Sequence, residues 1–134
     1  MTASKPSGGA RPVLAVVADL MFRSRIDEVA RRIGVELRVA RSPEQLERHL
    51  AGGLVPSLAL VDLEAETLDP VAAIARLKND DATRDVRVVA FAGHTNAAAI
   101  RAGRDAGADS VLARSAFTAQ LPAILAAVAN PRGA

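Results

Sequence analysis

Asp62 ends an apolar run, residues 57–62, that is typical of a buried parallel strand, and Glu64 follows two residues later. A carboxylate at such a point lies where an α/β sheet places its chemistry, because loops from several strands converge at the carboxyl edge. The sequence therefore predicts a candidate site around Asp62, although some of the groups expected around such a carboxylate are missing.

The two histidines and the glycines offer weaker candidates for chemistry. His94 follows an apolar run, but no nucleophile is spaced to partner it, so we expect a surface histidine. His49 stands beside Arg48 in a helical pattern and is expected on a solvated helix face. The turn after the first apolar run, residues 18–21, contains no glycine, which argues against a dinucleotide or P-loop site.

The composition bounds the class of protein. A chain of 134 residues, half of them hydrophobic, fits one domain with its own core. We expect a disordered tail over 1–10, a domain over 11–130 and a short tail over 131–134. The absence of cysteine excludes disulfides and zinc–thiolate sites and agrees with a cytoplasmic location. No apolar stretch approaches the roughly 20 residues of a membrane span, so we expect no membrane association.

The charge distribution argues against a nucleic-acid-binding protein. The net charge is only +2, and the arginines alternate with acids along the chain. There are three Phe and no Tyr or Trp, whereas a nucleic-acid surface needs clustered basic residues and stacking aromatics. We therefore expect a solvated surface of mixed charge.

Strand and helix patterns alternate strictly along the chain, which favours βαβ units around a parallel sheet. The expected strands cover 13–17, 36–40, 57–62, 86–92 and 110–113. The expected helices lie between them and after the last, and their start and stop signals are Gly34, Ser42-Pro43, Gly52-Gly53, Asp69-Pro70, Asn96, Gly107 and Asn130-Pro131. We place the start of the last helix near Thr118, because Pro122 is best tolerated in a first turn.

These patterns predict an α/β fold: a single doubly wound sheet of five parallel strands with five helices. Right-handed crossovers would place helices on both faces of the sheet.

Residues 11–130 resemble the receiver domain of two-component response regulators, which has a flavodoxin-like fold. The resemblance rests on Val-Val-Ala-Asp at 16–19, Val-Asp at 61–62, Ala-Gly-Ala-Asp at 106–109 and Val-Leu-Ala-Arg at 111–114. It implies the strand order 2-1-3-4-5. It also implies that Asp62 stands at the phosphoacceptor position and that Asp19 and Asp62 would be the ligands of a magnesium ion.

Several positions depart from the pattern that the resemblance implies. Ala18 stands where receivers have the first of two acids, and Ala92 where they have a phosphate-binding hydroxyl. Arg114 replaces the lysine after the fifth strand, and Ser115 replaces the proline that follows it. An arginine keeps the charge of lysine but not its geometry. Val111 stands in place of the aromatic residue that couples the pocket to the output face.

Two local hypotheses follow for the pocket. Arg114 could pair with Asp62 or with Asp19 as an internal counterion in place of lysine and magnesium. Glu64 could supply a metal oxygen in place of the missing acid, or it could be an ordinary loop acid. The sequence leaves both questions open.

For the function we expect a stand-alone, divergent receiver (pseudo-receiver) in phosphorelay signalling that binds proteins without being phosphorylated. Such a module is not an enzyme and needs no cofactor. Its partners would be a histidine kinase or an output protein, or a second copy, bound through 96–106, 110–113 and the last helix. The alternative is a working receiver that a histidine kinase phosphorylates on Asp62 with Mg²⁺. A third possibility is a small flavodoxin-like enzyme or ligand-binding protein.

Overall fold

Five parallel strands form one sheet in the order β2-β1-β3-β4-β5, which confirms the predicted fold class. The computed structural model describes residues 11–129, so the expected tails over 1–10 and 131–134 and the stop signal at Asn130-Pro131 lie outside the described residues. The strands are β1 (Val13–Val16), β2 (Leu37–Ala40), β3 (Leu58–Asp62), β4 (Arg87–Ala92) and β5 (Ser110–Ala113).

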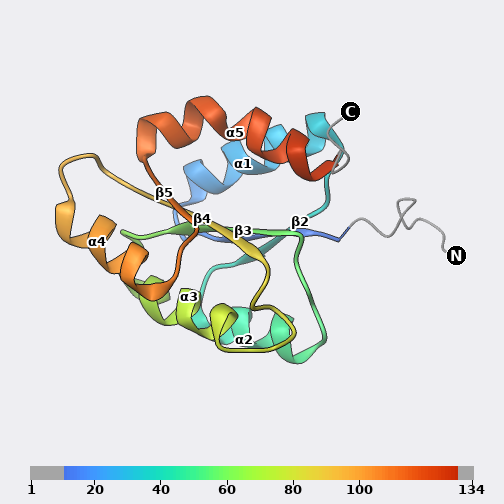
Figure 1. The fold of residues 1–134 in the computed structure, drawn as a ribbon. Helices are drawn as coiled ribbons and strands as arrows, with labels where there is room; N and C mark the ends of the chain where they lie inside the picture. Colours follow the sequence, from blue (N-terminus) through green and yellow to red (C-terminus); the bar gives the residue numbers. More distant parts are fainter. Residues whose placement is uncertain (1–10, 130–134) are drawn as a thin grey trace, which may run out of the picture.

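Five helices cover the two faces of this sheet: α1 (Leu20–Ile33), α2 (Pro43–Ala51), α3 (Pro70–Lys78), α4 (Ala97–Ala106) and α5 (Arg114–Ala129). A short 3-10 turn, η2 (Glu66–Leu68), precedes α3. Figure 1 shows α1 and α5 together on one face and α2, α3 and α4 on the other. None of the helices in the described part of the chain is long and apolar enough to cross a membrane.

The core forms two layers because the central strands are buried on both faces. β1 and β3 have no exposed residue, which explains why they read as continuous apolar runs rather than alternating ones. Alternate side chains along each strand point to opposite faces. Leu14 and Val61 therefore pack under α2 and α3, whereas Ala15 and Leu60 pack under α1 and α5.

Side-chain caps fix the starts of four helices, and three of these caps were predicted from the sequence. Ser42 accepts from the backbone N–H of Gln45, and Gln45 Oε1 accepts in return from the N–H of Arg41. Asp69 and Asn96 cap α3 and α4 in the same way. Asp19 caps α1 by accepting from the N–H of Phe22 at 3.0 Å. This last cap gives a candidate metal ligand a structural role.

The start of the last helix differs from the prediction. α5 begins at Arg114, directly after β5, and Pro122 lies inside the helix rather than in its first turn. Proline removes one backbone hydrogen bond from a helix interior. Phe117, Leu121 and Leu125 lie on both sides of that gap and are buried, so packing against the sheet and α1 holds the helix together across it.

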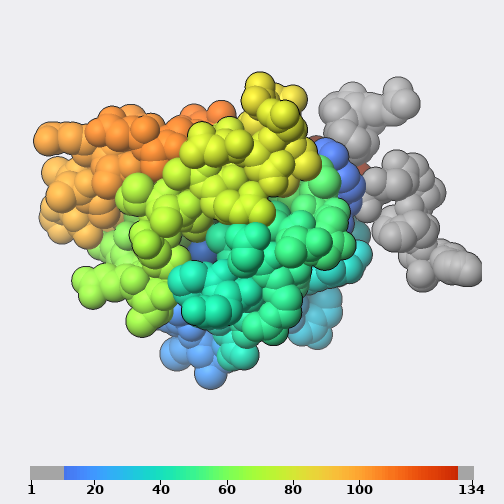
Figure 2. Space-filling view, turned by 90° about the horizontal axis from the view of Figure 1, so that it is seen from below, coloured from blue at the N-terminus to red at the C-terminus, as the bar shows by residue number. Residues whose placement is uncertain are grey.

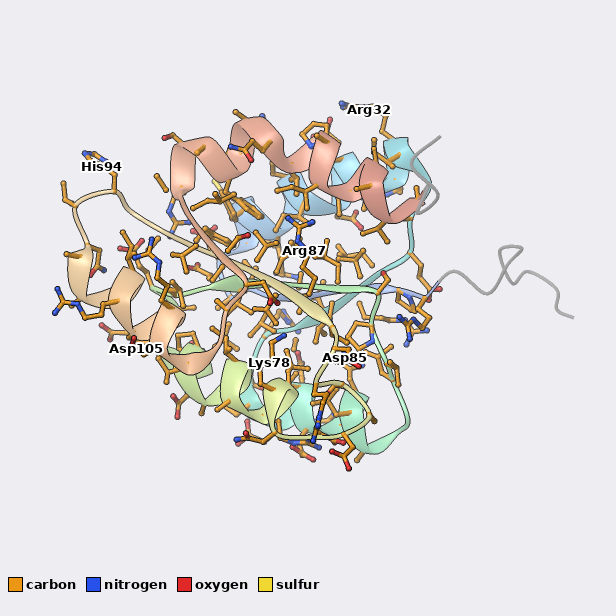
Figure 3. All side chains as sticks on the ribbon, in the orientation of Figure 1. Arg32, Lys78, Asp85, Arg87, His94 and Asp105 are labelled. Atoms are coloured by element: carbon orange, nitrogen blue, oxygen red, sulfur yellow. The ribbon has the colours of Figure 1, made fainter. Side chains whose placement is uncertain are left out.

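Asp109, in the segment that carried the family resemblance, joins three elements. Its carboxylate accepts from Lys78 Nζ at 3.0 Å and from the backbone N–H of Val88 at 2.8 Å. Lys78 also donates to the carbonyl of Val86, and Figure 3 shows this lysine between α3 and the sheet. The motif thus fixes β5 beside β4 and α3 below them.

Candidate functional site

Arg114 binds two carboxylates at the carboxyl edge of the sheet. Its Nη2 lies 2.9 Å from Glu64 Oε1 and 3.3 Å from Asp62 Oδ1. Asp62 is the last residue of β3, and Arg114 is the first residue of α5, directly after β5. The carboxyl ends of β3 and β5 lie at the same edge of the sheet with β4 between them, and the long Arg114 side chain spans that distance. Of the two partners left open by the sequence, the structure places Asp62 against Arg114. It gives Arg114 no ion pair with Asp19 within residues 11–129.

Glu64 is the most densely hydrogen-bonded acid of this group. Besides Arg114, its carboxylate accepts from the backbone N–H of Gly93 at 3.0 Å and from Asn96 Nδ2 at 2.8 Å. Because Arg114, Asn96 and Gly93 all donate to the charged form, the pKa of Glu64 falls to about 2. Both of its oxygens are therefore occupied, and Glu64 ties the loop after β3 to the starts of α4 and α5.

Asp62 has the opposite electrostatic character. It is 4% exposed, and this burial raises the pKa of Asp62 above its ordinary value, although the N–H of Glu64 and the charge of Arg114 oppose the rise. Oδ1 accepts from the backbone N–H of Glu64 at 2.9 Å and from Arg114. Oδ2 accepts no hydrogen bond from any residue that the structure describes. One oxygen of Asp62 thus remains uncommitted.

An aromatic cluster packs against the guanidinium of Arg114. Phe22, Phe91 and Phe117 are all the aromatic residues of the chain, and they come from α1, β4 and α5. The Phe91 and Phe117 ring centroids are 4.2 Å apart, and Phe22 lies 4.9 Å from Phe91. The Arg114 Cζ atom lies 5.1 Å from the centre of Phe22 and 5.3 Å from that of Phe91, within cation–π range.

The sequence did not indicate this cluster, because its three members are far apart in the chain. The one available signal is the alternation along β4, which turns Phe91 away from Ala90 and Ala92. Two carboxylates and two ring faces therefore hold one guanidinium. We call this group of Asp62, Glu64, Arg114, Phe22 and Phe91 the arginine clamp.

The other pocket residues lie around the clamp. Asp19 is exposed and shares a shallow hollow of about 460 Å³ with Arg114 and Phe22. Ala92, at the end of β4, is fully buried in the layer that faces α3, and it has no hydroxyl to offer. Ala18 packs against the same layer. Val111 packs there too, so its place in the sheet gives the pocket no aromatic contact.

This donor set does not fit a resident magnesium ion. Mg²⁺ requires close to six hard oxygens in octahedral geometry. In residues 11–129 no group of three or more His, Cys, Asp or Glu is placed to hold a metal. Both oxygens of Glu64 and one of Asp62 already accept hydrogen bonds, and the positive charge of Arg114 lies against both acids. As arranged here, a guanidinium lies beside the acids that would have to bind the cation.

The two histidines differ in their environment. His94 is exposed in the loop after β4, as Figure 3 shows, in agreement with the sequence interpretation. The expectation of a solvated His49 is wrong. Its ring is half-buried, and Nε2 lies 3.0 Å from the carbonyl oxygen of Val39. This carbonyl belongs to β2, which is an edge strand, and an edge strand leaves backbone groups that a side chain can satisfy.

Several solved structures share this fold. A protein from Chloroflexus aurantiacus described as a response regulator has a TM-score of 0.76 at 22% identity, with 88% of this chain and 96% of that chain covered. The phosphorylated cyanobacterial phytochrome response regulator RcpA has a TM-score of 0.72 at 21% identity, with 88% and 90% covered. The Mn²⁺-bound form of response regulator Rcp1 has a TM-score of 0.71 at 18% identity, with 85% and 91% covered.

No protein-family model matches the chain, and no curated protein matches it. At identities near 20% the structural likeness establishes the fold alone. The chain therefore has the flavodoxin-like fold of response-regulator receiver domains.

Proposed function

We propose that this chain is a divergent receiver domain that acts in two-component signalling as a protein-interaction module, without phosphorylation of Asp62. One observation carries the proposal: Arg114 binds Asp62 and Glu64 and rests on Phe22 and Phe91. Phosphoryl transfer depends mainly on positioning and on neutralising charge with metal and donors. Here a fixed guanidinium supplies the neutralising charge, and Ala92 supplies no hydroxyl.

The replacements at Ala18, Ala92 and Arg114 reinforce one another. Ala18 removes one acid from the metal site that the receiver resemblance implies, and Glu64, which could have replaced it, is bound to three donors. Arg114 has a rigid planar group suited to carboxylates, whereas the lysine that the resemblance implies would be a mobile point charge. The arginine clamp therefore supports a constitutive conformation in place of a phosphorylation-dependent switch.

The test is an attempt to phosphorylate the protein. The wild-type chain and Arg114→Lys are incubated with acetyl phosphate and Mg²⁺, and separately with beryllium fluoride and Mg²⁺. We expect neither a phosphoryl mass gain nor amide shifts around Asp62 in the wild type. Asp62→Asn is the matched control that cannot be phosphorylated. A mass gain in the wild type that Asp62→Asn abolishes would overturn the proposal.

A second function is favoured by one specific observation, the uncommitted Oδ2 of Asp62. In a working receiver this oxygen would attack the phosphorus of the donor. Arg114 would then have to leave at least one carboxylate to admit Mg²⁺. Phosphorylation of both the wild type and Arg114→Lys, with Arg114→Lys reacting faster, would support this function.

For the interaction surface we propose the face formed by α4, β5 and α5, with a histidine kinase, an output protein or a second copy as the partner. α4 begins with a run of alanines, of which Ala97 and Ala98 are exposed. Small side chains allow another helix to approach closely. Amide shifts confined to 97–129 on addition of a partner, or on raising the protein concentration, would identify this surface.

A further inference from the structure

A basic hollow lies at the free edge of the sheet, away from the arginine clamp. β2 is the edge strand, and α1 and α2 approach it from opposite faces. Figure 2 shows α2 in teal on this side of the molecule, with the blue start of α1 at its lower border. The hollow has a volume of about 640 Å³ and is lined by Arg23, Val39, Arg41, Gln45, Arg48 and His49. We call it the β2-edge hollow.

The arginines of this hollow have no acidic partners. No acid lines it, and neither Arg23, Arg41 nor Arg48 forms an ion pair with any residue that the structure describes. Two arginines further along α1, Arg31 and Arg32, each pair with an acid four residues earlier in the helix. Uncompensated like charges that face one cavity are unfavourable unless an anion joins them. The hollow thus has an unbalanced positive charge.

The surrounding contacts fix the shape of the hollow in advance. The backbone N–H of Arg41 donates to Gln45 Oε1 at 2.7 Å. His49 Nε2 lies 3.0 Å from the Val39 carbonyl oxygen, which can only accept, so Nε2 carries the proton. Arg23 Nε is buried and has no hydrogen-bond partner within the described residues. Because Nε is closed off from solvent, an anion in the hollow would contact the two Nη groups of Arg23 instead.

We propose that the β2-edge hollow binds a small-molecule anion that carries two or more phosphate groups. Guanidinium groups bind phosphate oxygens through paired, planar hydrogen bonds. Three arginines face the hollow, so one phosphate group would leave positive charge uncompensated, whereas two or three would balance it. A second hollow of about 510 Å³ shares Arg48 and His49 with the first, but Glu36 lines it and pairs with Arg38, so the anion is assigned to the first hollow.

This inference does not depend on the proposed signalling function, because no residue is shared with the arginine clamp. Inorganic pyrophosphate is the probe, titrated by calorimetry in magnesium-free buffer at constant ionic strength, because salt screens such contacts. Inorganic phosphate and citrate are titrated in parallel. We expect saturable pyrophosphate binding at one site, weaker phosphate binding and weaker citrate binding.

Four variants test the placement of the site. Arg23→Gln, Arg41→Gln and Arg48→Gln should each weaken pyrophosphate binding by about tenfold, since each removes one charged contact. Arg101→Gln is the matched control, because Arg101 is exposed on α4 outside the hollow, and its affinity should stay unchanged. Urea unfolding of each variant confirms that it is folded.

Three results would overturn the proposal. The first is the absence of saturable pyrophosphate binding by the folded wild type. The second is an equal loss of affinity in Arg101→Gln, which would indicate general charge attraction. The third is citrate or single phosphate binding as tightly as pyrophosphate, which would exclude the assigned ligand class.

Discussion

Arginines at two edges of the same sheet have opposite electrostatic surroundings. Arg114, between β5 and α5, binds two carboxylates and rests on two aromatic rings. Arg23, Arg41 and Arg48, around β2, face a hollow that no acid lines. The charge of Arg114 is compensated inside the molecule, whereas the charge of the β2 edge is available to an external anion. The partners of an arginine, more than its presence, determine what it can do.

The largest effect should come from breaking the arginine clamp. Arg114→Gln leaves Asp62 buried and without its countercharge, so the free energy of unfolding should fall by about 2 kcal/mol. This is below the range for fully buried pairs because the Arg114 side chain is 34% exposed. Urea unfolding at neutral pH measures it. A loss below about 0.5 kcal/mol would remove the contrast between the two edges.

The aromatic support of the clamp should contribute slightly less. Phe22→Leu removes the ring contacts with Phe91 and Phe117 and the cation–π contact with Arg114, which we expect to cost about 1.5 kcal/mol. The matched control is Leu20→Ala, because Leu20 is 63% exposed in the same helix turn. If both substitutions cost the same amount, the rings do not support the guanidinium.

The clamp should also give stability a specific pH dependence. The folded pKa of Glu64, about 2, lies below its ordinary value of 4.5, so its contribution is complete above pH 4.5 and disappears as the pH falls through 2. Glu64→Gln should therefore be less stable than the wild type by about 1 kcal/mol near pH 5.5 and no less stable below about pH 2. Urea midpoints at the two pH values test this. An unchanged difference would rule out titration of Glu64 as its cause.

The smallest effect is expected at the β2 edge. Arg41→Gln is the same substitution as Arg114→Gln, but Arg41 has no ion pair among the described residues, so the free energy of unfolding should change by less than about 0.5 kcal/mol. Without an added anion the variant should be as stable as the wild type, or slightly more stable because a like charge is gone. A loss near that of Arg114→Gln would indicate an internal role for Arg41.

The fold could be predicted because local signals along the chain agree with one another. Caps at Ser42, Asp69 and Asn96 mark helix starts, and buried strands appear as apolar runs. The start of α5 could not be predicted correctly, because the preference of proline for the first turn of a helix considers only neighbouring residues. The burial of Phe117 and Leu121 outweighs the missing hydrogen bond of Pro122, and this burial depends on residues far away in the chain.

The site could be predicted only in part, for a related reason. The family resemblance placed Asp62 and Arg114 in one pocket. The choice between Asp62 and Asp19 as the partner of Arg114 depends on side-chain geometry that spacing does not give. The arginines around β2 alternate with acids in sequence, which favoured a solvated surface of mixed charge. In the fold, α1 and α2 bring Arg23 and Arg48 to one hollow and leave the acids outside it.

The direct junction between β5 and α5 has a mechanical consequence. Because no loop separates the two elements, Arg114 is both the end of a sheet connection and the first residue of a 16-residue helix. A partner protein that bound α5 and tilted its first turn would pull the Arg114 guanidinium away from Asp62 and Glu64. Thermodynamic linkage makes such a relation reciprocal. Releasing the guanidinium from its acids would then change the affinity for the bound partner by the same factor by which the partner favours that release.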